Sequence, residues 1–341
     1  MASAWTFAFA MTGAALAIAA PASAADGPAY TQTASIPGPD GFWDVTSWDP
    51  ASHLVLVAHG TDVLVVDPAA GSTKAIGTFV RAHSALPIPG TGHILVTSGG
   101  DNSVRILDRV SGKELARIPV GANPDAAVVT PDGLHAYAMN ARDGTVSVID
   151  LKSAAETGRI ALKPGLEFAV LVSPTELAAN NEDQSEIELA DLATGKADEA
   201  IPLTGCTGPT GFAYASERHL ALSACGNGKA ALVDTKTRKL IRLVDIGAGP
   251  DTALWDAKRQ RFIIPCGRSG TLSIVQLDKG ANDAVVSQTP SEVSARTAAI
   301  DPATGRIFLP AARFGQGEPG KRPPLVPGSF HVLVMTPAAR S

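Results

Sequence analysis

The chain has 341 residues and a net charge of −5, and 45% of its residues are hydrophobic although only 5% are aromatic. Because the net charge is negative, binding to nucleic acid through general attraction to its phosphates is not expected. The 33 glycines and 25 prolines suit a protein of short strands and tight turns.

The first 24 residues have the features of a signal peptide. The stretch from Trp5 to Ala20 is almost wholly apolar, although no Lys or Arg precedes it, and the residues up to Ala24 form an AxA cleavage site. We therefore expect residues 1–24 to be removed and the mature chain, 25–341, to reach a periplasm. No later stretch is long and apolar enough to span a bilayer, so no membrane span is expected after cleavage.

One pattern recurs along the mature chain. An apolar strand closes on an acidic residue at intervals of 41 to 44 residues, and apolar residues alternate instead of recurring at helical spacing. Repeats of about 40 residues with four short strands are typical of propeller blades. The sequence predicts an all-β, seven-bladed β-propeller of four-stranded blades in a single domain, 25–341. The repeated acidic residues are Asp67, Asp108, Asp150, Asp191, Asp234 and Asp278.

The two ends of the mature chain complement each other. Residues 30–36 have the character of an outermost strand, whereas the last repeat stops after its third strand, at 331–335. We predict that the N-terminal strand completes the last blade and closes the ring, because an open ring would leave exposed sheet edges. Blade seven also carries a Pro/Gly-rich loop insertion, 315–328, interpreted either as a lid or as a solvated excursion.

Several runs point to a known family. The repeat GANPDAAVVTPDGLHAYAMNARDGTVSVID, together with the runs GCTGPTGFAY, GRSGTLSIV and ARTAAIDPATGRIFLPAARFG, resembles the YVTN/YncE-type seven-bladed propeller family of exported bacterial proteins. The resemblance covers essentially the whole mature chain. It implies a propeller fold and export, and it implies no particular chemistry because propellers host many functions.

Polar residues at the entry to the blades predict a site on the ring axis. In propellers, the loops that enter the first strand and those that join the second strand to the third lie on one face, here named the funnel face. Counting six positions back from the turn proline selects one residue in each of four blades. Alignment of the other blades adds the equivalent residues, which include Glu167 or Phe168 in blade four and Thr210 in blade five. The predicted ligand-binding residues are Asp44, His83, Asp125, Asn140, Glu167, Asp251 and Arg296.

Two functions could explain these polar residues at the axis. Regular repeats without a catalytic motif favour a non-catalytic, monomeric, periplasmic propeller that binds a small ligand or an envelope protein and needs no cofactor. The alternative is a metal-dependent hydrolase or lyase of the lactonase type, with a divalent cation held by Asp44, His83, Asp125 and Glu167. If the aspartates cap turns, their presence at the blade entries needs no ligand. A structural role in envelope assembly explains the polar residues less well.

The three cysteines suggest one disulfide and one free thiol. The blade alignment places Cys206 and Cys225 on neighbouring strand ends of blade five, which is the preferred pairing, whereas Cys225 and Cys266 occupy equivalent positions in adjacent blades and are the competitor. Of the remaining histidines, His59 follows the second strand of blade one and is interpreted as a solvated loop residue.

Overall fold

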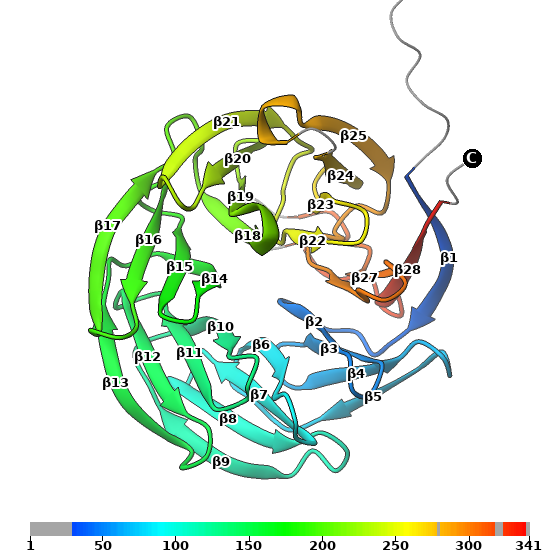
Figure 1. The fold of residues 1–341 in the computed structure, drawn as a ribbon. Helices are drawn as coiled ribbons and strands as arrows, with labels where there is room; N and C mark the ends of the chain where they lie inside the picture. Colours follow the sequence, from blue (N-terminus) through cyan, green and yellow to red (C-terminus); the bar gives the residue numbers. More distant parts are fainter. Residues whose placement is uncertain (1–28, 278–279, 318–322, 339–341) are drawn as a thin grey trace, which may run out of the picture.

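The computed structural model describes residues 29–277, 280–317 and 323–338, so the predicted signal peptide lies outside the described residues. Seven four-stranded antiparallel sheets stand around a central axis (Figure 1). The predicted all-β, seven-bladed propeller is confirmed. In the described part of the chain, no helix is long and apolar enough to cross a membrane.

The first four blades follow the chain from the axis outward. Blade one holds β2 (Thr46–Asp49), β3 (Leu54–Ala58), β4 (Val63–Asp67) and β5 (Ser72–Ile76). Blade two holds β6 (Ala82–Pro87), β7 (His93–Ser98), β8 (Ser103–Asp108) and β9 (Glu114–Pro119). Blade three holds β10 (Pro124–Val129), β11 (His135–Asn140), β12 (Thr145–Asp150) and β13 (Ala155–Ala161). Blade four holds β14 (Leu166–Ser173), β15 (Glu176–Asn181), β16 (Glu186–Asp191) and β17 (Lys196–Pro202).

The remaining blades include two short 3₁₀ turns, η1 (Ser216–Arg218) and η2 (Ala281–Asp283). Blade five holds β18 (Pro209–Ala215), β19 (Leu220–Cys225), β20 (Lys229–Asp234) and β21 (Lys239–Asp245). Blade six holds β22 (Leu254–Asp256), β23 (Arg261–Cys266), β24 (Thr271–Gln276) and β25 (Val285–Pro290). Blade seven holds β26 (Ala299–Ile300), β27 (Ile307–Ala311), β28 (His331–Pro337) and β1 (Tyr30–Pro37).

The first strand of the described chain closes the ring. β1 pairs antiparallel with β28, with Ile36 opposite Val332, and the two strands lie side by side in Figure 1. The chain that follows β1 is also bonded to the residues just before β28, because the carboxylate of Asp40 accepts hydrogen bonds from the amides of Gly328 (2.6 Å) and Phe330 (3.2 Å). The predicted closure by the N-terminal strand is therefore confirmed.

The repeated acidic residue has a local cause. At the end of β12, Asp150 Oδ1 accepts hydrogen bonds from the amide (2.6 Å) and the hydroxyl (2.7 Å) of Ser153. The hydroxyl and amide of Ser153 favour the ionised carboxylate and lower the pKa of Asp150. Such a side chain satisfies the backbone of the turn into the outermost strand. The same turn is capped by Asp67, Asp108, Asp191 and Asp234.

Each interface between neighbouring blades holds an apolar cluster of its own. Leu56 and Val63 of blade one, for example, are fully buried against Ile94 and Leu107 of blade two. The described residues form seven such clusters, one for every interface around the ring. Because both faces of a blade are covered by its neighbours, the blades depend on closure for their burial.

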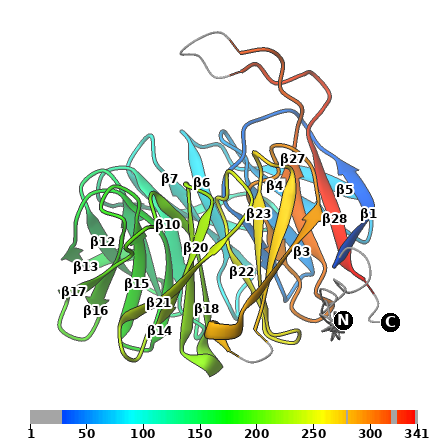
Figure 2. The same ribbon diagram turned by 90° about the horizontal axis from the view of Figure 1, so that it is seen from above.

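The insertion in blade seven begins and ends as a hairpin. It joins β27 to β28, and its described parts project from the funnel face (Figure 2). The amide of Gly315 donates to Pro324 O and that of Val326 to Arg313 O, both at 2.8 Å. At its base, the ring of Phe314 lies 6.3 Å from that of Phe42. The described ends of the insertion are thus held against the entry to blade one.

The disulfide is the one that the blade alignment favours. Cys206 and Cys225 are bonded, with their Cα atoms 5.5 Å apart. The competing pairing of Cys225 with Cys266 is wrong, because Cys266 is a free, buried thiol. Its Sγ lies 3.4 Å from the hydroxyl of Ser273, and burial raises the pKa of the thiol.

Thiol titration of the unfolded, unreduced protein is expected to find one free thiol, that of Cys266. The double substitution Cys206→Ala/Cys225→Ala is expected to lower the free energy of unfolding by about 3 kcal/mol, because a cross-link of this loop length restricts the unfolded chain. Denaturant titration measures the loss, with Cys266→Ala as the control that keeps the bridge. Three free thiols in the native preparation would contradict the pairing.

Candidate functional site

Three of the predicted site residues meet beside the axis. The Nδ1 atom of His83 lies 2.7 Å from Asp44 Oδ2 and 3.4 Å from Asp125 Oδ1. His83 is buried, whereas the side chains of Asp44 and Asp125 remain 29% and 19% exposed. Blades one, two and three thus bring one imidazole and two carboxylates together at the funnel.

A break in strand pairing places these residues. In blades two to five, the first residue of the innermost strand pairs with its neighbour and the register then shifts. Such irregularities turn a side chain away from the regular alternation of a strand. In blades two, three, four and five respectively, the paired position is followed by His83, Asp125, Glu167 and Thr210.

Hydroxyl groups from neighbouring strands hold the entry loops. Thr97 Oγ1 and Ser84 Oγ donate to the carbonyl of Asp125 at 2.7 and 3.1 Å. Thr297 Oγ1 donates to the carbonyl of Asp44 at 2.9 Å. Because each bond crosses from one blade to the next, the spacing of the two carboxylates is fixed by the ring itself.

Blades six and seven contribute the ion pair of Asp251 and Arg296. The Nε of Arg296 lies 2.6 Å from Asp251 Oδ2, and its Nη2 donates to the carbonyl of Trp43 at 2.7 Å. The guanidinium also lies 5.6 Å from the centre of the Trp43 ring, within the range of a cation–π contact. Arg296 is therefore held in one orientation by blades one and six.

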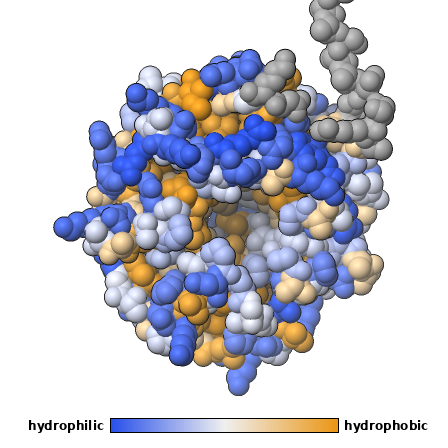
Figure 3. Space-filling model, viewed as in Figure 1, coloured by the Kyte–Doolittle hydropathy of each residue, from blue (hydrophilic) through white to orange (hydrophobic). Residues whose placement is uncertain are grey.

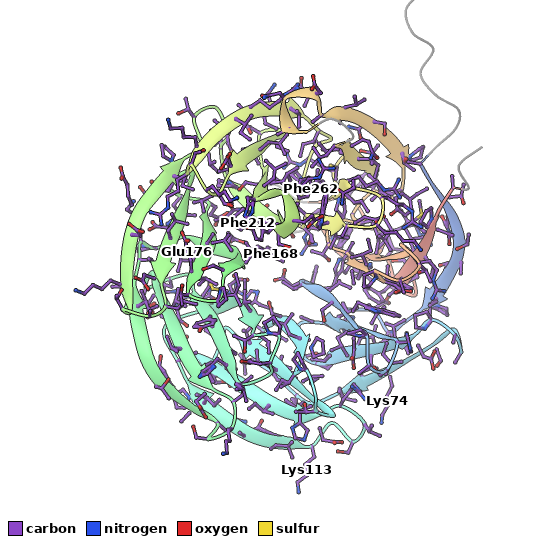
Figure 4. The ribbon with its side chains drawn as sticks, viewed as in Figure 1. Lys74, Lys113, Phe168, Glu176, Phe212 and Phe262 are labelled. Atoms are coloured by element: carbon purple, nitrogen blue, oxygen red, sulfur yellow. A yellow bond between two sulfur atoms is a disulfide. The ribbon has the colours of Figure 1, made fainter. Side chains whose placement is uncertain are left out.

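Glu167 is the residue that blade four directs to the axis. The charges of Asp125 and Asp251 act on its carboxyl group, which places Glu167 with the other axial acids. Phe168 instead packs against the apolar cluster between blades four and five, next to Phe212 (Figure 4). The choice between Glu167 and Phe168, left open by the sequence, is thereby decided.

The axial acids are crowded and poorly solvated. Burial is the main cause that raises the pKa of Asp125 to about 7, of Asp251 to about 6 and of Glu167 to about 10, and the neighbouring carboxylates add to it. Burial opposes the charge of His83, but the hydrogen bond to Asp44 and the charge of Asp125 outweigh it and raise the pKa of His83. The funnel thus favours positive charge.

Asn140, a residue of the predicted site, has other contacts, and so does Asn180 of blade four. Asn140 is fully buried, and its Nδ2 donates to the hydroxyls of Thr145 and Ser147, both at 2.9 Å. Asn180 Nδ2 donates to the carbonyl of Thr210 at 3.0 Å. Asn140 therefore braces the hairpin of blade three, and Asn180 joins blade four to blade five; the structure does not bring either to the group around His83.

The interpretation of His59 as a solvated residue is wrong. His59 is only 4% exposed, and its Nδ1 lies 3.1 Å from Asp62 Oδ1. Its ring packs edge-on against Phe330, with ring centres 4.9 Å apart. The reason is the closure of the ring, which brings the start of β28 over the loop that carries His59.

Two cavities open at the funnel face, and Arg296 lines both. One, of about 490 Å³, lies between blades six and seven and is bordered by Asp251, Arg268 and Val293. The other, of about 140 Å³, is bordered by Asp44, His83 and Arg81. Sequence reasoning missed Arg81 and Arg268, although both occupy loops that the blade alignment assigns to this face.

The opposite face also offers a cavity. It measures about 730 Å³, lies among blades three to five, and is bordered mainly by apolar groups that include Tyr137, Leu171 and Tyr214. It contains none of the predicted site residues. The centre of the ring is itself hollowed on the face that Figure 3 shows.

Comparison with known proteins supports the fold and no more. No family model matches the chain, and no curated protein matches it. Among solved structures, hydrazine synthase from Kuenenia stuttgartiensis is similar, with a TM-score of 0.68 and 17% sequence identity over 82% of this chain and 94% of that chain. A likeness at this level of identity is one of propeller architecture.

Replacement of one axial acid is expected to stabilise the protein at alkaline pH. Between pH 4 and 7 the Asp125 carboxyl ionises in the unfolded chain but not in the folded one, so its contribution to the free energy of unfolding falls as the pH rises and is constant above about pH 7. The raised pKa of His83 acts in the same direction above pH 6.5, because the folded state holds that proton more tightly.

Asp125→Asn should therefore raise the free energy of unfolding by about 1–3 kcal/mol at pH 8 and flatten its dependence on pH. Denaturant titrations from pH 4 to 9 measure both. Asp245→Asn is the control, since Asp245 is an 86% exposed residue on the outermost strand of blade five. An equal pH dependence in the wild type and Asp125→Asn would contradict the expectation.

Proposed function

We propose that this protein is an exported, non-catalytic β-propeller that binds a small polar ligand at its funnel face. The single observation that carries the proposal is the convergence of four carboxyl groups and one imidazole on the axis, where the pKa values of Asp125, Glu167 and Asp251 are raised. Groups with strongly perturbed pKa values beside a cavity are typical of binding and catalytic sites. We propose further that the protein is monomeric and belongs to the YVTN/YncE-type family that its repeats resemble.

The charge of the site suggests what the ligand carries. Ionisation of Asp125 and Asp251 is opposed by burial and by neighbouring carboxylates, and a cationic group placed between them would relieve both effects. Along the two cavities, the described basic residues are Arg81, His83, Arg268 and Arg296, of which Arg296 is already paired with Asp251 and His83 with Asp44. A ligand with an ammonium group is therefore favoured over a neutral or an anionic one.

Export is supported by two features. Residues 1–24 have the composition of a signal peptide with a cleavage site after Ala24, and a disulfide joins Cys206 to Cys225. Disulfides persist in oxidising compartments such as the bacterial periplasm. N-terminal sequencing of the protein recovered from the periplasmic fraction is expected to begin at Ala25; recovery in the cytoplasm with the leader intact would contradict export.

A metal-dependent hydrolase or lyase is the second candidate, and one observation favours it. Ligand atoms of Asp44, His83 and Asp125 all lie within 4.8 Å of one another, close enough to share a cation. An imidazole with two carboxylates suits a divalent transition metal, which would polarise a carbonyl group of a substrate. Glu167, the fourth residue of the predicted metal set, lies outside this group.

One set of calorimetric titrations at pH 8 tests both candidates. Butylamine, putrescine and choline are compared with the neutral butanol, and Mn²⁺ and Zn²⁺ are titrated separately. We expect at least one amine to bind the wild type, and Asp125→Asn to weaken that binding tenfold or more, because it removes a charge that faces the ammonium group. Glu167→Gln should also weaken binding, because a bound ammonium group would lower the raised pKa of Glu167 and ionise a carboxyl group that is protonated at pH 8 in the free protein. Asp245→Asn should leave it unchanged.

The other outcomes are equally informative. Stoichiometric binding of Mn²⁺ or Zn²⁺ that is lost in His83→Ala would favour the metal-dependent candidate. Failure of every amine to bind better than butanol, with no cation bound, would overturn the proposal of a binding site at the funnel. Binding that Asp125→Asn leaves intact would place the site elsewhere on the propeller.

A further inference from the structure

The cavity between blades six and seven is lined by groups of both charges. Its acidic group is Asp251, on whose carboxyl group the charges of Asp44 and Glu182 act. Its basic groups are Arg268, an exposed residue of the loop that joins β23 to β24, and Arg296, which is paired with Asp251.

The guanidinium of Arg268 is available to a ligand. Within the described residues, its side chain forms no hydrogen bond or ion pair, although it borders a cavity of about 490 Å³. Arg296 uses its Nε for Asp251 and its Nη2 for the carbonyl of Trp43, which leaves its Nη1 unused by any described residue. Two guanidinium groups therefore present free donors to one cavity, an arrangement that suits a carboxylate.

Glycines bring the two arginines to this cavity. A Cβ on Gly267 would lie 2.8 Å from Arg296 Cβ, and a Cβ on Gly249 would lie 2.7 Å from Arg268 Cβ. Gly249 also has a φ of +71°, a conformation that other residues rarely adopt. The two loops can therefore pack this closely only because both positions lack a side chain.

We propose that this cavity binds the zwitterionic head group of an α-amino acid or a short peptide. The proposal rests on the funnel being a ligand-binding site and names the ligand class. The ligand carboxylate lies between Arg268 and Nη1 of Arg296, and its ammonium group contacts Asp251. The side chain lies against Val293, which is 64% exposed at the rim. The volume falls within the range of small-molecule sites.

Simpler ligands fit the charges less well. An anion without an ammonium group would bring negative charge next to Asp251, where Asp44 and Glu182 already oppose ionisation. An amine without a carboxylate would leave Arg268 without a partner. Only a ligand with both groups can pair with the acid and with the arginines that line the cavity.

The test is a calorimetric titration of the mature protein at pH 8. The twenty L-amino acids are screened first, and the tightest binder is then compared with its amide, which lacks the carboxylate, and with its deaminated acid, which lacks the ammonium group. We expect each analogue to bind at least tenfold more weakly. Arg268→Met is expected to weaken binding of the amino acid about tenfold and to leave binding of the amide unchanged.

A matched control is available in blade three. Arg142 is an exposed arginine at the equivalent position of the loop between β11 and β12, and within the described residues its side chain likewise has no partner. Arg142→Met should leave the affinity unchanged. An amide that binds as well as its amino acid, or an equal loss in Arg142→Met and Arg268→Met, would overturn the inference.

The result separates this inference from the function on which it rests. If amines bind with dependence on Asp125 and a carboxylate adds nothing, the funnel binds cations and the assignment of Arg268 is wrong. If neither amines nor any L-amino acid binds, both proposals fail.

Discussion

The pairing of β1 with β28 is the interaction on which the rest of the molecule depends. It completes blade seven and presses that blade against blade one, so that every blade is covered on both faces. The candidate site crosses the same seam, because Thr297 of blade seven holds the carbonyl of Asp44, and Arg296 holds that of Trp43. Closure therefore sets both the burial of the core and the spacing of the axial side chains.

A closed ring also explains why acidic groups can be kept together. The backbones that carry Asp44 and Asp125 are fixed by hydroxyl groups from other strands, so the carboxylates cannot move apart to relieve their repulsion. Burial, the larger cause, and this repulsion together raise the pKa values of Asp125 and Asp251. Functional sites commonly lower stability in this way. In the proposed function, the ligand supplies the positive charge that the ring lacks.

Much of the architecture could be predicted from the sequence. The recurring aspartate caps the turn before the outermost strand in blades one to five, as Asp150 does with Ser153, so a local hydrogen bond marks each of these blades, whereas Asp278 of blade six lies outside the described residues. The lone strand at 30–36 could be assigned to the last blade because that blade lacks a fourth strand in the sequence. The pairing of Cys206 with Cys225 followed from the same alignment, since the two residues lie on neighbouring strand ends.

The candidate site could be predicted only in part. Counting back from the turn prolines identified Asp44, His83, Asp125 and Arg296, and the blade alignment added Asp251; the structure brings all five to the funnel. The loop between the second and third strands of blade three suggested Asn140, whose amide instead braces its own blade. The errors concern orientation: a one-residue shift in strand register decides whether a side chain faces the axis or the neighbouring blade, as Glu167 and Phe168 illustrate.

The sequence by itself thus determined the repeat, the number of blades and the closing strand, because turns and alternation of apolar residues are local properties of a chain. Only the tertiary structure decided that His83 lies between two carboxylates, that His59 is buried under Phe330, and that Arg268 and Arg296 border one cavity. Each of these contacts joins different blades or the closing seam. Their distances depend on the curvature of the whole ring, which no single repeat encodes.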